Sequence, residues 1–249
     1  MRRTVLLTLV AGTLVFLGVL VLYLPASWFA SRLPPQVRCE ELGGSIWHGE
    51  CLGLSVQGGK LGDATWNLSA FKALTGRLTG DVDVRGGALT ANTELDLKFD
   101  GSGELRNLQA RFPMDPAFVA QFPRDQRGNI TAQFTRLVLA RGGTPAELEG
   151  SVELLDFRQT LPRPIELGSY RLSFDGAPRE DGSSMGALND VGGPFAVDGT
   201  VTFTPPNTYV IQGFITGRTA QAESIVREIT LGVPPDASGR SAFQFENSF

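Results

Sequence analysis

Reactive residue types gather in the segment GGSIWHGECLGL, residues 43–54. It contains His48, the only histidine of the chain, and Cys51, one of two cysteines. A cysteine beside a histidine can form a nucleophile and its base, and any Ser-His-Asp triad in this chain would have to use His48. However, the two residues are three positions apart, and an odd offset in a β-strand places side chains on opposite faces. The spacing therefore favours packed or solvated strand residues over a catalytic pair.

A second candidate for nucleophilic chemistry is SAFK, in which Ser69 and Lys72 match the S-x-x-K pattern of acyl-enzymes. The pattern is short, its K-T-G partner motif does not occur in the sequence, and a surface turn between strands explains it better. Paired carboxylates such as Asp81 and Asp83 could bind Ca²⁺, but they fit the solvated face of a strand. The sequence has no Walker A or dinucleotide-binding motif. We expect no enzyme, no cofactor and no metal site.

The N-terminus holds the longest apolar run. Residues 4–24 follow Met1-Arg2-Arg3 and contain no charged side chain. As a helix rising about 1.5 Å per residue, this run spans the roughly 30 Å hydrocarbon core of a bilayer. A cleaved signal peptide has a shorter apolar region and a small-x-small cleavage site, which the exit LPASWFA fits poorly. The sequence therefore predicts an uncleaved anchor, and Arg2 with Arg3 predicts a cytoplasmic N-terminus and an extracytoplasmic remainder.

This location determines what we expect of Cys39 and Cys51. Two thiols in one short region of an extracytoplasmic protein tend to form a disulfide. Zinc usually takes four Cys or His ligands, and the chain offers three such residues. We therefore predict a Cys39–Cys51 disulfide. The formal net charge of −4 argues separately against nucleic acid as a main partner.

Alternation of apolar and polar residues dominates the chain after residue 36. In LTANTELDLKF, residues 89–99, the side chains alternate with period two, which is typical of a strand with one dry and one wet face. The same alternation recurs at residues 78–85, 130–135, 147–154, 195–204 and 209–215. Glycine-rich turns separate the runs. The pattern predicts a mainly β fold, a long curved antiparallel sheet of roughly ten to twelve strands in the form of a half-barrel or a folded-over sheet.

Three segments break the alternation. SAFKALTG after Trp66 predicts one helical turn at most. MDPAFVAQFP, residues 114–123, begins with the capping residue Asp115 and an early proline. TAQAESIVREITLGV, residues 219–233, has an apolar stripe and a Gly and Pro stop. The predicted organisation is a cytoplasmic N-terminus (1–3), a transmembrane helix (4–24), a juxtamembrane linker (25–35) and one periplasmic β-rich domain with two short helices (36–249).

The order of these features resembles the type II secretion system protein N family. The resemblance is carried by G-x-x-W-x-G at Gly44, Trp47 and Gly49, by TWNLSAFKALTGRL, and by the closing ITLGVPPDASGRSAFQF. It implies a non-catalytic, single-pass inner-membrane protein of a Gram-negative envelope with a periplasmic domain. Such a protein takes part in export of folded proteins across the outer membrane through protein–protein contacts. The implied partners are other type II secretion proteins: the inner-membrane platform, the pseudopilus or the secretin.

Within this layout, GGSIWHGECLGL is the second arm of the first hairpin. We expect Gly43 and Gly44 to make the turn and Trp47 to pack inward. Cys39 and Cys51 lie at similar distances from that turn, so that a disulfide would join the two arms.

An anchor followed by a long sheet with one apolar face is also similar to the AsmA-like envelope proteins. The alternative function is therefore a periplasmic lipid- or hydrophobe-binding protein, because a curled sheet can leave its apolar face open to acyl chains. The two interpretations differ in what covers that face. Helices at 114–123 and 219–231 would plug it, or it would stay open. A periplasmic hydrolase using Ser69 and Lys72 is the weakest alternative.

Overall fold

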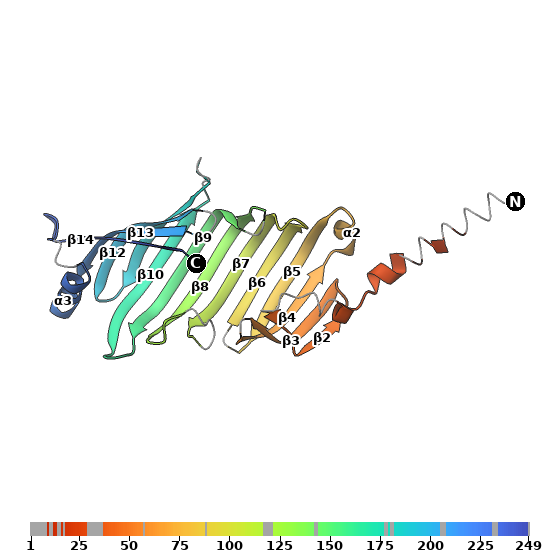
Figure 1. Cartoon of the computed structure of the whole chain (residues 1–249), viewed down its shortest axis with the longest axis horizontal. Coiled ribbons are helices and arrows are strands. Elements are labelled where there is room, and N and C mark those ends of the chain that lie inside the picture. The colour runs from red at the N-terminus through yellow and green to blue at the C-terminus, as the bar shows by residue number, and fades with distance from the viewer. Residues whose placement is uncertain are drawn as a thin grey trace.

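The computed structural model describes residues 18–28, 37–56, 58–87, 89–116, 122–141, 144–176, 182–204, 208–230 and 234–248, together with residues 9, 12, 13, 16 and 179. Fourteen strands form one antiparallel sheet, in the order β1-β3-β4 and then consecutively to β14, with β2 also paired to β3. Figure 1 shows a long, twisted sheet with the N-terminal helical segment at one end and α3 at the other. The mainly β, antiparallel fold class is confirmed.

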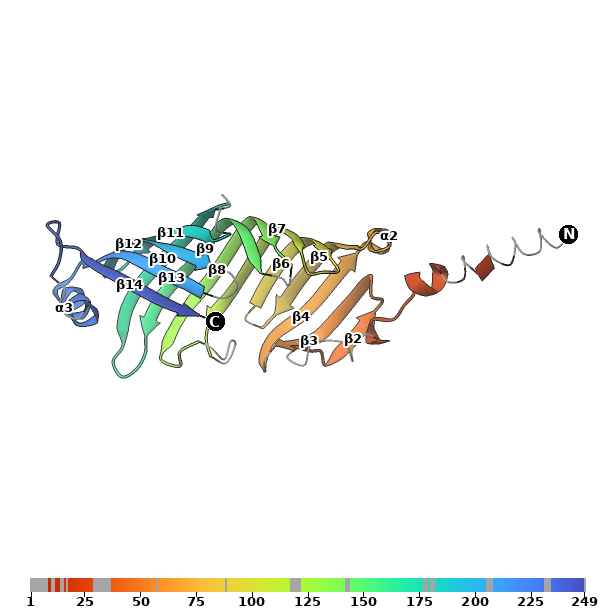
Figure 2. The ribbon, with the colours of Figure 1, turned by 45° about the horizontal axis from the view of Figure 1, so that its top comes forward.

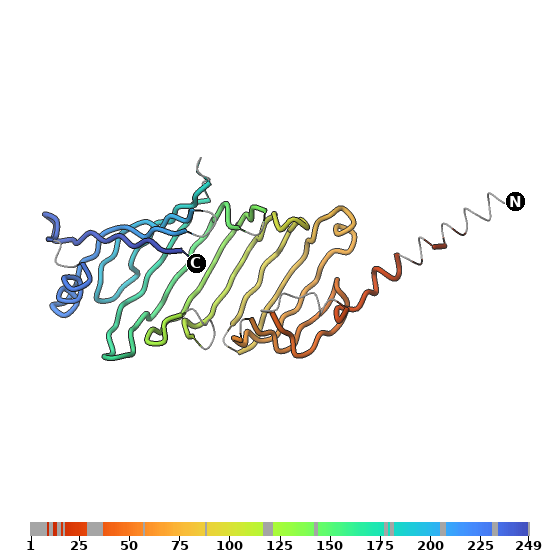
Figure 3. Tube along the Cα trace, in the orientation of Figure 1, coloured from red at the N-terminus to blue at the C-terminus, as the bar shows by residue number. Residues whose placement is uncertain are grey.

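The strands are β1 (Val37–Arg38), β2 (Glu41–Gly44), β3 (His48–Val56), β4 (Gly59–Leu68), β5 (Arg77–Gly86), β6 (Leu89–Lys98), β7 (Gly103–Met114), β8 (Gln126–Leu139), β9 (Pro145–Gln159), β10 (Ile165–Asp175), β11 (Ser184–Gly192), β12 (Phe195–Thr204), β13 (Thr208–Gly217) and β14 (Ser241–Ser248). The helices are α2 (Ala70–Ala73) and α3 (Ala220–Ile229). The trace in Figure 3 runs back and forth along the sheet, because from β3 onward each strand pairs with the next one in the chain.

The sheet has fourteen strands where the alternation predicts roughly ten to twelve, and one of the additional strands arises because the first strand is interrupted. β1 has two residues and β2 has four. Both pair with β3 in one register, in which Arg38 lies opposite Ser55 and Glu41 opposite Leu52. Cys39 and Glu40 separate the two pieces. One broken edge strand is therefore counted as two.

The two helices that fall on described residues agree with the sequence. α2 is a single turn, and the Ser69 side chain caps it by accepting from the Lys72 backbone N–H at 3.4 Å. α3 begins after Thr219, whose hydroxyl accepts from the Ala222 N–H at 3.1 Å. It ends at Ile229, and residues 231–233 lie outside the described part of the chain.

Two other predicted elements are described only in part. Of the anchor, residues 4–24, the structure describes residues 9, 12, 13, 16 and 18–24, and the centre of the predicted helix at 114–123 lies outside the described residues. Within the described part of the chain, no helix combines the length and the apolar character that crossing a membrane requires.

The core of the sheet is thin. Phe195, Val197, Ala222 and Val226 form one buried cluster where α3 packs on the sheet. Phe134, Leu148 and Phe174 form a second cluster near the middle, to which Phe203 adds a half-buried ring. In Figures 1 and 2, β13 and β14 cross in front of β9 and β10, so the sheet coils over itself at its C-terminal end.

The accessible surface shows how open this architecture is. The chain exposes 15843 Å², whereas a compact 26.7 kDa protein exposes about 11,000 Å² by the usual scaling of surface with mass. A compact domain buries both faces of its sheet in packed layers. Here much of one apolar face is left only half-buried.

Candidate functional site: the apolar face and the N-terminal hairpin

One line of paired residues across the sheet is apolar on every strand from β3 to β14. We call it the apolar row; its members are Cys51, Ala64, Val84, Ala91, Ala110, Ala132, Val152, Leu172, Leu188, Gly199, Gly213 and Phe243. Each member lies directly opposite the next one on the neighbouring strand. With strands about 4.8 Å apart, the row is about 50 Å long.

The neighbouring line of paired residues is polar, and we call it the polar row. Its members are Glu50, Thr65, Asp83, Asn92, Gln109, Gln133, Ser151, Ser173, Ala187, Thr200, Gln212 and Gln244. Successive residues of a strand point to opposite faces. The two rows therefore define an apolar face and a polar face that keep their identity along the whole sheet, with Ala187 as the exception.

Charge follows the same division. On β5 to β8, the strand positions that share a face with the apolar row carry no charged side chain. On the polar face, Arg136 binds Glu104 at 2.9 Å and Glu147 at 3.0 Å. At the α3 end, Asp190 lies on the apolar side, and Arg218 neutralises it at 2.7 Å. The middle of the apolar face is thus an uncharged surface.

Only part of this face is covered by described residues. α3 packs through Ala222 and Val226 against a cluster that includes Leu188 and Phe243, at the C-terminal end of the row. The central members from β5 to β10 are half-buried. Of the described helices, α3 alone contributes to the two hydrophobic clusters.

A ladder of aromatic rings runs beside the C-terminal half of the row. Phe134, Phe174, Phe203, Tyr209 and Phe245 follow one another with ring centroids 6.1–6.2 Å apart. These separations lie within the range of favourable ring–ring packing.

A glycine makes the first step of this ladder possible. Gly150 on β9 pairs with both Phe134 and Phe174. A Cβ atom there would lie 2.2 Å from the Gln133 carbonyl oxygen. The close backbone approach therefore requires glycine at this position, which leaves no side chain on the strand between the two rings.

The first hairpin turns at a different place from the one expected. Gly43 and Gly44 are the last residues of β2, and Gly44 pairs with Gly49. The turn is Ser45 to Trp47, two residues later, so the prediction that the glycines form it is wrong. The Ser45 hydroxyl accepts from the His48 N–H at 3.0 Å, and a serine that bonds backbone in this way stabilises a turn. Gly44 takes φ +73° to enter it.

This turn holds the exit of the N-terminal helical segment. Trp47 is 7 % exposed, and its indole Nε1–H donates to the Val21 carbonyl at 2.8 Å. The Ile46 N–H donates to the Leu24 carbonyl at 3.0 Å. Pro25 bridges to Ser45. Trp47 therefore packs inward, against the chain that precedes the sheet.

A second tryptophan locks the same turn from β4. The Trp66 Nε1–H donates to the Ile46 carbonyl at 3.0 Å. Its ring lies over Gly49, where a Cβ atom would be 2.4 Å from the Trp66 Cζ2 atom. Gly49 thus has a packing role, because any larger residue would displace the ring.

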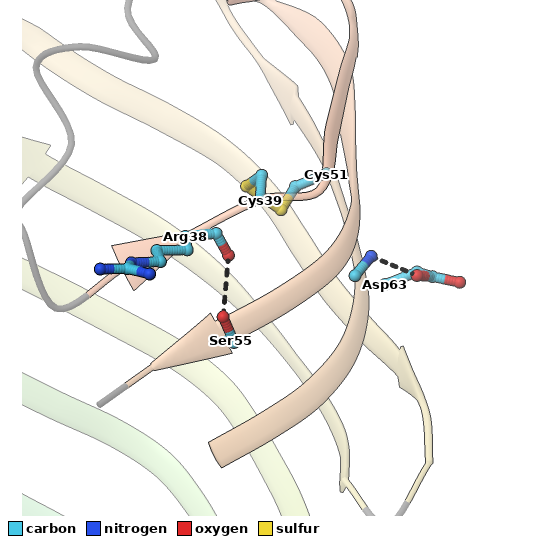
Figure 4. The surroundings of a disulfide bond; sticks show 6 residues. Arg38, Cys39, Cys51, Ser55 and Asp63 are labelled. Atoms are coloured by element: carbon cyan, nitrogen blue, oxygen red, sulfur yellow. Dashed lines mark hydrogen bonds between the residues drawn. A yellow bond between two sulfur atoms is a disulfide. The ribbon is translucent and has the colours of Figure 1, made fainter. Parts of the chain in front are cut away.

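The two cysteines lie where the edge strand is broken. The structure joins Cys39, between β1 and β2, to Cys51 on β3, with Cα atoms 5.5 Å apart. In Figure 4 the bond lies beside the hydrogen bond from the Ser55 hydroxyl to the Arg38 carbonyl. Cys51 is 2 % exposed, whereas His48 is exposed. The two residues do not form a catalytic pair in this arrangement.

Comparison with known families matches residues 35–244 to the model described as type II secretion system (T2SS), protein N. The match extends from the segment before β1 into β14 and so includes the hairpin, the sheet and α3. The chain belongs to this family. No curated protein and no solved structure matches it significantly. Members of the protein N family are components of the type II secretion system and are generally non-enzymatic.

The segments that carry the resemblance to the protein N family lie at the two ends of the sheet. Gly44, Trp47 and Gly49 build the turn that holds residues 21–25. The closing segment leads into β14, and Asp236 there accepts from the Arg240 backbone N–H at 2.9 Å. These residues shape the ends of the sheet.

Ser69 and Lys72 do not form a catalytic arrangement. The Ser69 hydroxyl caps α2, and the Lys72 side chain borders a hollow on the polar face with Asp81, Glu94 and Asp96. In the residues that the structure covers, no group of three or more His, Cys, Asp or Glu side chains is placed to hold a metal ion. Among the described residues of this protein N family member, the surfaces of the sheet are therefore the functional candidates that remain.

Glu104 is the most perturbed carboxyl of the polar face. A hydrogen bond from Arg106 at 2.9 Å, followed by one from Arg136, lowers the pKa of Glu104 to about 2. The network formed by Arg106, Glu104, Arg136 and Glu147 crosses β7, β8 and β9. It was not predicted, because alternation shows which residues share a face but not which ones pair.

Proposed function

We propose that this protein is a single-pass component of the type II secretion system in the inner membrane, with its N-terminus in the cytoplasm and its sheet in the periplasm. It acts without catalysis, through protein–protein contacts. Membership of the protein N family supports the assignment to the system. The uncharged run at residues 4–24 supports the anchor, and the Cys39–Cys51 disulfide fits an oxidising compartment.

The observation that carries the contact surface is the free edge of β14. Among the described residues, this strand closes the order of the sheet and pairs only with β13. It has eight residues, and Phe245 on it is 52 % exposed. A strand edge of this kind presents unpaired backbone groups to which an extended segment of a partner can add as a further strand. We assign the partner contact to β14.

A secretion assay tests the assignment to the system. Deletion of the gene should leave secreted hydrolases in the periplasm, and the intact chain should restore their export. Unchanged export with a leaky envelope would contradict the proposed role in secretion.

Site-specific photo-crosslinking tests the contact surface. A photoreactive residue at Gln244 on β14 should capture a platform, pseudopilus or secretin protein, identified by mass spectrometry. The same residue at Gln109, which occupies the polar row on the central strand β7, is the matched control. Equal capture at both positions, or none at Gln244, would refute the edge contact.

The open apolar row favours a second candidate function, binding of a hydrophobic ligand. Its central members are half-buried beneath no described helix. The surface of about 11,000 Å² expected of a compact chain of this mass is well below the 15843 Å² observed. A contiguous apolar face that is left only half-buried is typical of an interaction site. The two functions use different parts of the sheet and are compatible.

A further inference from the structure

We propose that the apolar row binds the hydrocarbon chains of membrane lipids. The inference rests on the second proposed function and names its ligand class. The binding region is the stretch of the row from β6 to β8, where Ala91, Ala110 and Ala132 lie opposite one another.

Larger apolar residues flank these alanines along the strands. On one side of the Ala110–Ala132 pair, Leu108 lies opposite Phe134, and on the other side Phe112 lies opposite Ile130. Residues 108 and 112 are four positions apart, which is about 13 Å along a strand. A strip of methyl groups therefore runs across the strands between two lines of larger apolar residues.

The chemistry of this surface selects hydrocarbon over an extended peptide. The backbone groups of β6, β7 and β8 already pair with both neighbouring strands. The face offers no charged side chain there. A polypeptide laid on this surface would bury N–H and C=O groups without partners, at a cost of several kcal/mol on the apolar-solvent scale, about 4–8 each. An acyl chain carries no such groups.

The position of the row indicates a membrane as the source of the hydrocarbon. The row begins at Cys51 and Ala64, on the strands next to the turn that holds Val21 and Leu24. The N-terminal helical segment, whose end this turn holds, exposes Leu20 and Leu22. In the proposed topology these residues lie in the bilayer, so the row starts at the membrane surface and leads away from it.

Photo-crosslinking in cells tests the ligand class directly. The photoreactive residue is placed at Ala132 in the apolar row and, in a matched variant, at Gln133, the next residue on β8 in the polar row. Both variants are made in the full-length chain, and the intact masses of the purified adducts are measured by mass spectrometry. We expect a lipid-sized mass increase at Ala132 and none at Gln133. A protein-sized adduct at Ala132 would overturn the lipid assignment while leaving a hydrophobic interaction site in place. No adduct at Ala132 would refute both.

A binding measurement guards against variants that fold poorly. Full-length protein in detergent is mixed with a phosphatidylethanolamine that carries a fluorescent acyl chain. Ala110→Arg places a charge in the apolar row, and Gln109→Arg places the same charge on the polar face. We expect at least about a tenfold loss of binding for Ala110→Arg, since burying a charge costs more than the roughly 1.4 kcal/mol of one decade. Equal affinity of the two variants, with circular dichroism matching wild type, would overturn the proposal. Secretion is measured separately, so failure here leaves the secretion role untouched.

Discussion

At its N-terminal end the sheet finishes in a strand broken into β1 and β2, whereas at its C-terminal end it finishes in the uninterrupted β14. The first edge is tied to β3 by the Cys39–Cys51 disulfide, and its turn binds the chain that precedes it. The second is supported by α3 on one face and open along its edge. The difference has a physical consequence: a broken edge tied by a disulfide is a poor template for strand addition, whereas a continuous edge is a good one.

The chain provides an optical probe of its N-terminal end that can be compared with a probe of the whole sheet. All three tryptophans, Trp28, Trp47 and Trp66, lie in the N-terminal third, whereas Tyr170 and Tyr209 lie in the C-terminal half. Tryptophan fluorescence during urea unfolding therefore reports the N-terminal end, and far-UV circular dichroism reports the whole sheet.

The largest expected effect is at the α3 end. Phe195 is 3 % exposed and packs in the cluster with Val197, Ala222 and Val226. Phe195→Ala should lower the free energy of unfolding by about 3–5 kcal/mol, because it removes buried area and leaves a cavity. Urea unfolding followed by circular dichroism measures the loss. Phe99→Ala, at a position 68 % exposed, should stay within about 0.5 kcal/mol. Similar losses for both variants would show that α3 does not hold this end.

The next effect concerns the disulfide. Replacing both Cys39 and Cys51 by Ser should cost about 2–4 kcal/mol, since the bond closes a short loop. The tryptophan-detected transition should move more than the circular dichroism transition, because the loss is local to the N-terminal end. Wild-type protein under reducing conditions is the control and should behave like the variant. Intact mass measurement on oxidised periplasmic protein should find no free thiol, and two free thiols would exclude the bond.

Trp47 separates the role of the indole hydrogen bond from that of packing. Trp47→Phe keeps an aromatic ring but removes the N–H that donates to Val21. We expect a loss of about 0.5–1.5 kcal/mol, the usual net value of one hydrogen bond, detected in the fluorescence of Trp66. Trp28→Phe, at a position 67 % exposed, is the matched change. If the two variants are equally stable, the hairpin does not hold the helix exit by this bond.

The smallest effect is expected in the middle of the sheet. Glu104 has a pKa lowered from 4.5 to about 2, chiefly by Arg106. Its contribution to stability is therefore complete above about pH 4.5 and is lost as the pH falls through 2. Glu104→Gln should cost about 0.2–1 kcal/mol at neutral pH, because the side chain is partly exposed, and should flatten the acid limb of the stability curve. Glu246→Gln on β14 gives the same chemical change elsewhere, and an acid limb unchanged by Glu104→Gln would exclude this network as its source.

Alternation in the sequence predicted the strands and their two faces because period two reports local geometry directly. It could not predict the pairing. Asn107 and Asp156 adopt positive φ, 50° and 52°, and register shifts occur beside both. Such irregularities decide which alanine lies opposite which, and no local pattern marks them. The row of Ala91, Ala110 and Ala132 emerges only once the strands are paired.

The N-terminal hairpin shows the same limit at shorter range. The sequence located the arms and the inward Trp47, but the glycine pair suggested a turn two residues too early. Ser45 determines the real turn by accepting from two backbone N–H groups, those of Trp47 and His48. The contact with Val21 joins residues 26 positions apart, and no pattern in the sequence relates them.

The direction of the strands has a mechanical consequence. The long axis of the molecule runs across the central strands, whereas β14 lies nearly along it (Figure 1). Tension between the two ends therefore acts on the central strands along their inter-strand hydrogen bonds, which run perpendicular to antiparallel strands. Bonds loaded in this direction break pair by pair. Pulling the two ends apart would separate the central strands one after another, whereas pushing or rotating β14 would move the whole sheet as a lever about the fixed turn at Ser45. The sheet is built to transmit position along its length and to yield under traction.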